Sequence, residues 1–450
     1  MKQSKYLLAS AMFLLIVSCA TNHYAAVDGE VLNGKYGEAV ETHEKKKTKL
    51  YNGKSVILYL LDSGMLNHFA GNYDVSITQL QDGERAIGEA YTKSVGEALA
   101  ASVVNHKSKS YAGEEYEDMY INAFNALNYY NKDKYESAMV EVRRMSEKLK
   151  FVNDKNEALT AILDEKENHN AKKTAEKLGV PLYIPPNFYR VVLGDSALGR
   201  YLSMLFYLHD KKYDDARIDY EAIETIFANA RNVYNFPVPE SVKEEMTVNP
   251  NFARLNVIAF SGLSPIKEAE ARTLQFDDDF KIQYTTPKLL DRPSIISSIE
   301  VEFDNGGKYE MKLLENISAV QAELMRFALE TVMKETTARL LVKAVPSAIA
   351  YSVGKNLTKN GAGVGAIVGV WMWLGGTLGG LSLSATEHAD TRATHYFPGK
   401  AYINGIWLKP GVYSFKVNFY SSDKIVASVP FNNVQINAGE LNLYEAYCLK

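Results

Sequence analysis

Apolar positions in the first half of the chain recur with a helical period in three stretches that share one pattern. In each stretch a helix ends in a short polar turn, and a tyrosine follows two residues after a Gly, Asp or Lys. A small side chain lies three residues beyond each tyrosine and allows close helix packing. The tyrosines are Tyr73, Tyr135 and Tyr213, and the small residues are Ser76, Ala138 and Ala216. The pattern predicts three helical hairpins.

This pattern resembles the tetratricopeptide (TPR) helix-turn-helix, whose unit is about 34 residues long. The tyrosines are instead 135 − 73 = 62 and 213 − 135 = 78 residues apart. The repeats are therefore degenerate or interrupted, and an irregular helical bundle is the alternative. We expect a TPR-like α-helical domain over residues 55–250, which Pro237, Pro239 and Pro250 close.

After residue 251 the apolar period changes to two, which is typical of strands. Tyr413–Phe419 alternates strictly, and Gly306-Gly307 and Pro410-Gly411 are plausible turns. The expected strands lie near residues 255–260, 280–284, 295–303, 309–313, 401–408, 413–420, 425–430 and 433–436. Two blocks, 251–315 and 387–450, are interpreted as one β-sandwich-like domain split by a helical hairpin insertion over 316–386. The fold class is therefore α+β.

The insertion begins near Ser318, which together with Gln321 can form a capping box, and Pro346 predicts a kink. Residues 360–386 hold no charged side chain and are rich in glycine. Four-residue glycine spacing lets another helix approach closely. One interpretation is a membrane-inserting or oligomerising segment; the other is a helix buried in the fold.

The start of the chain is typical of a secretory signal, with Lys2 and Lys5 before a short apolar run from Tyr6 to Val17. Ile16-Val17-Ser18-Cys19 resembles the lipobox of bacterial lipoproteins. The resemblance implies that residues 1–18 are a signal peptide and that Cys19 carries lipid, whose several acyl chains make a durable membrane anchor. An ordinary signal with an incidental cysteine is the alternative. Residues 19–54, polar and rich in lysine, are interpreted as a lipidated tether. Ala20, after the cysteine, resembles the default outer-membrane sorting pattern, which places the protein in the cell envelope facing the periplasm.

Composition allows a large core and limits the partners. Hydrophobic residues make up 46% of the chain, and the net charge is 50 − 54 = −4, spread along the sequence. Nucleic acid is therefore not an expected partner. If Cys19 carries lipid, Cys448 has no cysteine to pair with, and packing or an intermolecular bridge are its possible roles.

Few residues have the spacing of a chemical site. Arg143 and Arg144 could grip a carboxylate or phosphate, although a solvated helix face is the plainer interpretation. His388, Asp390 and His395 lack the further ligand that zinc needs, and an ion pair between Asp390 and Arg392 is the alternative. No catalytic or cofactor motif occurs, so no metal, cofactor or enzymatic activity is expected; a hydrolase with scattered acids remains an alternative.

Several short blocks together resemble a family of bacterial lipoproteins that have TPR-like helices and a C-terminal β domain. These blocks are 111–117, 125–127, 138–144, 200–203, 262–265 and 389–392. The resemblance brings no assigned activity. It favours a non-catalytic scaffold or assembly factor whose helical groove binds an envelope protein or peptide, with oligomerisation possible. In TPR modules the inner helices line the groove, which implies Tyr120, Tyr130, Asn131, Tyr201 and His209 as partner-binding residues.

Overall fold

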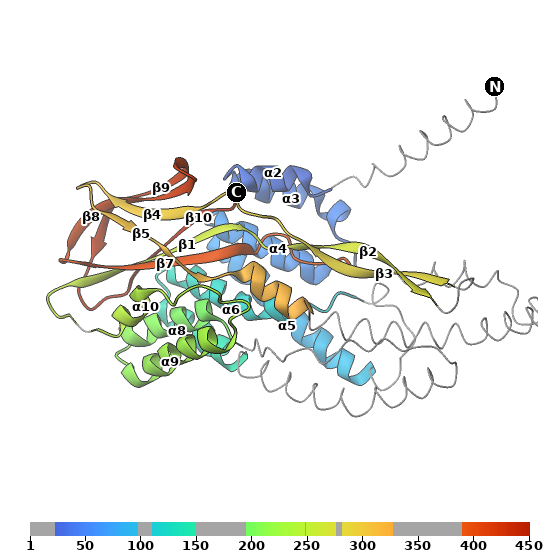
Figure 1. Cartoon of the computed structure of the whole chain (residues 1–450), viewed down its shortest axis with the longest axis horizontal. Helices are drawn as coiled ribbons and strands as arrows, with labels where there is room; N and C mark the ends of the chain where they lie inside the picture. The colour runs from blue at the N-terminus through green and yellow to red at the C-terminus, as the bar shows by residue number, and fades with distance from the viewer. Residues whose placement is uncertain (1–22, 98–109, 149–194, 248, 276–280, 327–388) are drawn as a thin grey trace, which may run out of the picture.

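The N-terminal half of the described chain is helical and the C-terminal half is rich in strands, so the fold is α+β (Figure 1). The computed structural model describes residues 23–97, 110–148, 195–247, 249–275, 281–326 and 389–450. The helices are α2 (Ala25–Leu32), α3 (Tyr36–Leu50), α4 (Val56–Phe69), α5 (Tyr73–Glu97), α6 (Glu115–Tyr130), a helix over residues 135–148, α8 (Ala197–His209), α9 (Tyr213–Asn229) and α10 (Glu240–Glu245).

Four helical hairpins are closed by the same turn. Gly34, Gly71, Asp133 and Lys211 each take a left-handed backbone conformation, with φ between +56° and +76°. In each turn the next residue's N–H donates to the carbonyl five positions back, at 2.8–2.9 Å. This bond satisfies a carbonyl that the end of the helix leaves without a partner. The tyrosine two residues after the left-handed residue begins the second helix of each hairpin, as the sequence pattern predicts for three of the four.

The hairpin that the sequence pattern does not predict is α2–α3, the first along the chain. It shows that the interpretation of residues 19–54 as a tether is wrong for residues 25–50. Gly34, Tyr36 and Ala39 repeat the spacing of the other turns, and residues 25–50 form two helices. Val27, Val31 and Ala39 are fully buried. Lysines at exposed positions of α3 account for the polar composition, while its inner face packs like that of any other helix in the layer.

Close packing of the two helices explains why each hairpin has a small residue three positions after its tyrosine. The side chains three residues after the tyrosines are Ala39, Ser76, Ala138 and Ala216, and each is 0% exposed. Ser76 of α5 also donates its hydroxyl to the Gly64 carbonyl of α4, the preceding helix of the same hairpin, at 2.8 Å. A larger side chain at these positions would push the two helices of a hairpin apart.

In the part of the chain that the structure describes, two four-stranded sheets and one two-stranded ribbon follow the helices. Sheet A has the order β10-β1-β7-β6, sheet C has the order β5-β4-β8-β9, and β2 pairs only with β3. The strands are β1 (Ala253–Leu263), β2 (Ile266–Gln275), β3 (Lys281–Leu290), β4 (Ser298–Phe303), β5 (Lys308–Glu310), β6 (Lys312–Glu315), β7 (Pro398–Leu408), β8 (Gly411–Ser421), β9 (Lys424–Ile436) and β10 (Asn442–Cys448). β10 runs parallel to β1, and the other pairs are antiparallel.

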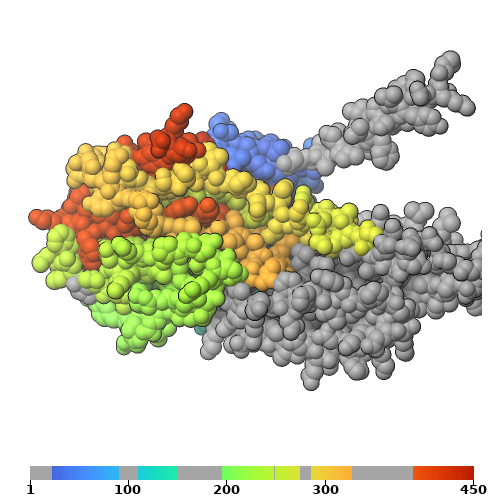
Figure 2. Space-filling model, in the orientation of Figure 1, coloured from blue at the N-terminus to red at the C-terminus, as the bar shows by residue number. Residues whose placement is uncertain are grey.

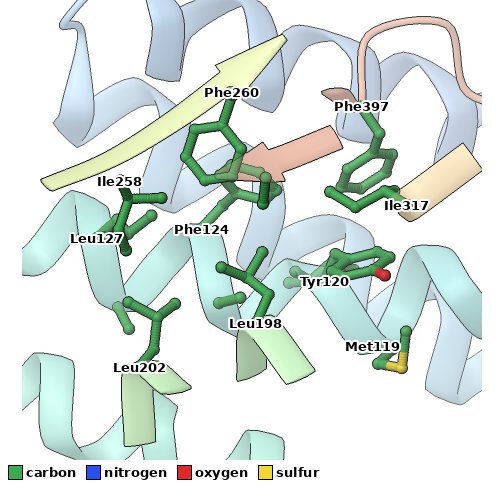
Figure 3. Packing of buried hydrophobic residues seen from close by; sticks show 14 of the residues in the cluster. Met119, Tyr120, Phe124, Leu127, Leu198, Leu202, Ile258, Phe260, Ile317 and Phe397 are labelled. Atoms are coloured by element: carbon green, nitrogen blue, oxygen red, sulfur yellow. The ribbon is translucent and has the colours of Figure 1, made fainter. Parts of the chain in front are cut away.

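Sheet A lies between the helices and sheet C, so the molecule has three layers. On β1, Leu255 and Val257 face a core shared with sheet C, whereas Ile258 and Phe260 face the helices. Figure 3 shows Phe260 against Phe124 of α6, with ring centroids 5.4 Å apart. Packing on both faces explains why β1 is buried almost throughout.

The helix that follows β6 begins at Ile317, and its start corrects the capping expectation. Asn316 accepts the Ala319 N–H through its side chain at 3.1 Å, so Asn316 rather than Ser318 is the cap. This helix is described to residue 326. The rest of the expected hairpin insertion, with Pro346 and residues 360–386, lies outside the described residues, as do the expected signal peptide and Cys19. Within the described ranges, no helix combines the length and the hydropathy that a bilayer crossing requires.

Candidate functional site

The tyrosines that the sequence assigns to a partner-binding groove are buried inside the protein. Tyr120 is 1% exposed and Tyr201 is 0% exposed. The Tyr120 hydroxyl donates to Glu315 of β6, and the Tyr201 hydroxyl donates to Glu245 of α10 at 3.2 Å. Their assignment as partner contacts is therefore wrong for this conformation, because a partner cannot reach them.

Two further groove residues contact β10 of the same chain. The Tyr130 hydroxyl donates to the Leu441 carbonyl and accepts the Leu443 N–H at 3.1 Å. Asn131 donates its side-chain amide to Glu445 at 2.5 Å. His209 is half-buried, with its ring 4.6 Å from that of Tyr135. Sheet A thus covers the inner face of the helical layer, where the sequence interpretation places a partner.

The two adjacent arginines differ in their surroundings. Arg143 is exposed. Arg144 pairs with Glu84 of α5 at 2.5 Å and with Glu141 at 3.4 Å, and so links neighbouring helices. Only Arg143 retains a guanidinium that is open to a ligand.

A group of titratable side chains surrounds Asp62 on α4. Tyr51, which follows α3, donates its hydroxyl to Asp62 Oδ2 at 2.6 Å. The same hydroxyl lies 2.8 Å from Nε2 of His43, and the His395 backbone N–H donates to Asp62 Oδ1 at 2.7 Å. These contacts join the α2–α3 hairpin, α4 and the loop before β7. We call this group the Asp62 junction.

Burial sets the protonation states in the Asp62 junction. It raises the pKa of Asp62 to about 7, although hydrogen bonds from Tyr51 and His395 oppose the shift. Burial lowers the pKa of His43 to about 4 and that of His395 to about 3, the latter with help from Arg292. Both imidazoles are therefore neutral near pH 7, and the carboxyl of Asp62 is the group that gains or loses a proton there.

Other side chains close the Asp62 junction from outside. The Tyr24 ring stacks on His395 with centroids 3.6 Å apart, and Tyr396 donates its hydroxyl to Asp28 at 3.2 Å. Arg292 donates to the His395 carbonyl. Asp62 is 0% exposed. A substrate could reach Asp62 only if these side chains moved, so in this conformation the group acts as a structural joint that can hold one proton.

Buried carboxylates join the layers at two further places. Glu315 accepts hydrogen bonds from Ser196 and Tyr234 and from the Leu198 N–H, at 2.8–3.0 Å, in addition to that from Tyr120. Glu117 of α6 accepts hydrogen bonds from Tyr111, Tyr116 and the Thr394 N–H at 2.8–3.2 Å. Burial raises the pKa of both carboxyls. In each case groups of this chain surround the acid, which fits a structural role.

The expected ion pair between Asp390 and Arg392 is confirmed, with Oδ2 and Nη2 2.7 Å apart. His388 lies outside the described residues. Among the residues that the structure describes, no group of three or more His, Cys, Asp and Glu side chains could hold a metal ion. Cys448 is buried in the core between the two sheets, which favours the interpretation that it serves packing.

The sequence holds a signal for these sites that motif searches do not use. Asp62 and Glu315 each follow two leucines directly, in Leu60-Leu61-Asp62 and Leu313-Leu314-Glu315. An acid at the end of an apolar run is buried with its neighbours and must then find hydrogen-bond donors. The identity of those donors could not be read from the sequence, because they come from distant segments.

Comparisons of the chain with protein-family models, curated proteins and solved structures give no match.

Proposed function

We propose that this protein is a lipid-anchored, non-catalytic scaffold of the bacterial cell envelope, held by acyl chains on Cys19. The observation that supports the anchor is the order Lys2, Lys5, apolar run, small residue and cysteine at the start of the chain. The proposed site is the outer membrane, facing the periplasm.

The folded body begins soon after the proposed anchor. Cys19 and Tyr24 are 24 − 19 = 5 residues apart, so the chain between them can span at most about 18 Å. A long tether would let the body move far from the bilayer, whereas this short connection holds it at the membrane face. The α2–α3 hairpin is the part of the body nearest to the anchor along the chain.

The links between the layers support a scaffold that keeps its shape. Glu315, Glu117 and Asp62 each bind groups from at least two segments that are distant in sequence. A buried carboxylate that loses its donors is costly, so these contacts oppose sliding of the helices over sheet A.

A partner must then bind outside the helical layer, because sheet A covers the inside. Val140 is 49% exposed and Ile218 is 54% exposed. They are equivalent positions of neighbouring hairpins, each five residues after the tyrosine that begins the second helix. Arg143 is exposed close to Val140 in the sequence. We assign the contact with an envelope protein or peptide to this outer surface of Val140, Arg143 and Ile218.

The anchor is tested by intact-mass measurement and membrane fractionation of the native protein. We expect acyl chains on Cys19, and we expect Cys19→Ser to remove both the added mass and the membrane association. Cys448→Ala is the control, since it removes the other sulfur without touching the anchor. An unmodified N-terminus would refute the anchor.

The partner surface is tested by photocrosslinking in intact envelopes. A crosslinking residue at Val140, Arg143 or Ile218 should give defined protein adducts. The control position is Val412, an apolar side chain that is 60% exposed at the start of β8. If the three helical positions give no more adduct than Val412, the surface assignment is wrong.

A further inference from the structure

We propose that the C-terminal end of α3 binds anionic phospholipid headgroups of the membrane that holds the anchor. We call the side chains of Lys45, Lys46, Lys47, Lys49 and Lys54 the lysine cluster. This inference rests on the proposed lipidation of Cys19, and it names the surface of the body that faces the bilayer.

The lysine cluster lies where the chain from Cys19 joins the folded body. The rings of Tyr24 and Tyr51 meet edge to face, with centroids 6.1 Å apart. The Tyr51 N–H donates to the Lys47 carbonyl at 2.8 Å, so Tyr51 directly continues the last turn of α3. Tyr24 therefore lies beside the end of α3 that carries the lysines. Figure 2 shows the α2–α3 hairpin, in blue, on the outer surface of the molecule.

The charge of this region is opposite to that of the whole chain. Residues 41–54 hold five lysines against Glu41 and Glu44, a balance of 5 − 2 = +3, whereas the chain carries −4. Some of the lysine charge is already engaged, because Lys45 lies 3.2 Å from Glu41 and Lys47 lies 3.6 Å from the Tyr59 ring.

Two lysines remain available for a ligand. Lys49 is exposed and Lys46 is partly exposed, and neither forms an ion pair with another described residue. An ammonium group is a compact charge on a flexible stem, which suits a phosphate that has no fixed orientation.

The short connection makes weak attraction effective. Attraction between exposed charges decays over about 8 Å in physiological salt. The five-residue connection from Cys19 to Tyr24, at most about 18 Å long, lets the lysine cluster reach that distance from the bilayer. Lipidation also makes headgroup binding an intramolecular event, so its effective concentration is high. The bonds of Tyr51 to His43 and Asp62 hold the end of α3 against α4, so the lysines cannot turn away freely.

The contact is measured on the native lipoprotein in vesicles. Thr48→Cys places a fluorophore on an exposed position of α3 between the lysines, while Cys448 is too buried to be labelled. Lipids with a quencher on the headgroup report how close the label lies to the surface. The vesicles are phosphatidylcholine alone, or phosphatidylcholine with phosphatidylglycerol.

We expect strong quenching only with phosphatidylglycerol, and we expect raised salt to weaken it. Each lysine at an anionic surface changes the equilibrium about fivefold. Lys46→Glu with Lys49→Glu should therefore shift the bound population by at least about tenfold. The matched control is Lys211→Glu with Lys243→Glu, which reverses two exposed lysines on α8–α10, at the opposite end of the helical layer (Figure 1).

The two proposals fail in different ways. If the wild-type protein does not float with either vesicle, Cys19 carries no anchor, and the inference falls with the proposed function. If the protein floats but quenching is the same in both lipids, or is unchanged by the Lys46 and Lys49 substitutions, the lysine cluster does not bind headgroups and the anchor stands. Equal loss of quenching in the control variant would also refute the inference.

Discussion

Asp62→Asn should stabilise the protein above neutral pH, because the wild-type carboxylate is ionised there at a buried position. The amide keeps the shape of the side chain and an oxygen for the His395 N–H. It can also donate to Tyr51, whose hydroxyl then donates to His43. Only the buried charge is lost.

The magnitude follows from the two protonation equilibria. The pKa of Asp62 is about 7 in the folded protein and 3.8 as a free side chain. Between these values the folded state holds a proton that the unfolded state has lost, so the contribution of Asp62 to stability falls as pH rises from about 4 to about 7. At 1.36 kcal/mol per pKa unit, ionised Asp62 costs up to about 4 kcal/mol above pH 7.

The histidines have the opposite sign and set the shape of the pH profile. The pKa of His43, about 4 when folded, lies below its free value of 6.5, and that of His395 is lower still. Both imidazoles bind protons more readily in the unfolded state, so their contribution to stability rises with pH up to about 6.5. Two histidine contributions outweigh that of Asp62 below about pH 6.5, so the stability of the wild-type protein should rise with pH to about pH 7 and then stay level.

Urea unfolding across this pH range measures the effect. Asp62→Asn should match the wild type near pH 4, gain stability more steeply as pH rises, and exceed the wild type by up to about 4 kcal/mol above pH 7. Asp82→Asn is the control, because Asp82 forms an exposed pair with Arg85 and its loss should cost under about 1 kcal/mol at every pH. If Asp62→Asn is less stable than the wild type above pH 7, Asp62 is not a buried acid of raised pKa.

Three further predictions concern hydroxyls, small side chains and turns. Tyr51→Phe should cost about 1–3 kcal/mol in urea unfolding, because it leaves buried polar groups without a partner, whereas Tyr59→Phe should cost under about 1 kcal/mol. Ala39→Leu should lower the free energy of unfolding by about 1–3 kcal/mol, because it overpacks the α2–α3 hairpin. Ala26→Leu, at an exposed position of α2, should be nearly neutral in the same assay. Equal effects of the two substitutions would favour the tether interpretation. Gly71→Ala, at φ +76°, should lower the thermal midpoint through a loss of about 1–2 kcal/mol, and an unchanged midpoint would contradict the left-handed turn.

Local periodicity was sufficient to predict the helical hairpins and several strands. Tyr73, Tyr135 and Tyr213 each begin a helix, and the strict alternation of 413–419 lies inside β8. The same spacing occurs at Gly34, Tyr36 and Ala39, where the lysine-rich composition instead indicates a tether. Composition describes the exposed face of a helix, whereas the spacing of the small residue describes the buried face.

The candidate site could not be predicted, because its contacts join distant segments. The place of Tyr120 on an inner helix predicts a partner contact, yet its hydroxyl donates to Glu315, which lies 315 − 120 = 195 residues away. β10 was also missed, although Leu443 and Glu445 cover the helices that carry Tyr130 and Asn131. A periodic pattern shows which face is buried but not what covers it.

The position of β10 determines the order in which the molecule can assemble. Leu255 of β1 pairs with Asn442 of β10, 442 − 255 = 187 residues later. Until that pairing forms, β1 lacks one neighbour, and the ends of α4 and α6 that contact β10, at Phe69 and Tyr130, remain open to water. Contacts between segments so far apart close slowly, because a long loop must first lose its entropy. The helices are made first, but the last strand completes their hydrophobic cover, so a newly made chain passes through a stage in which it needs protection from aggregation.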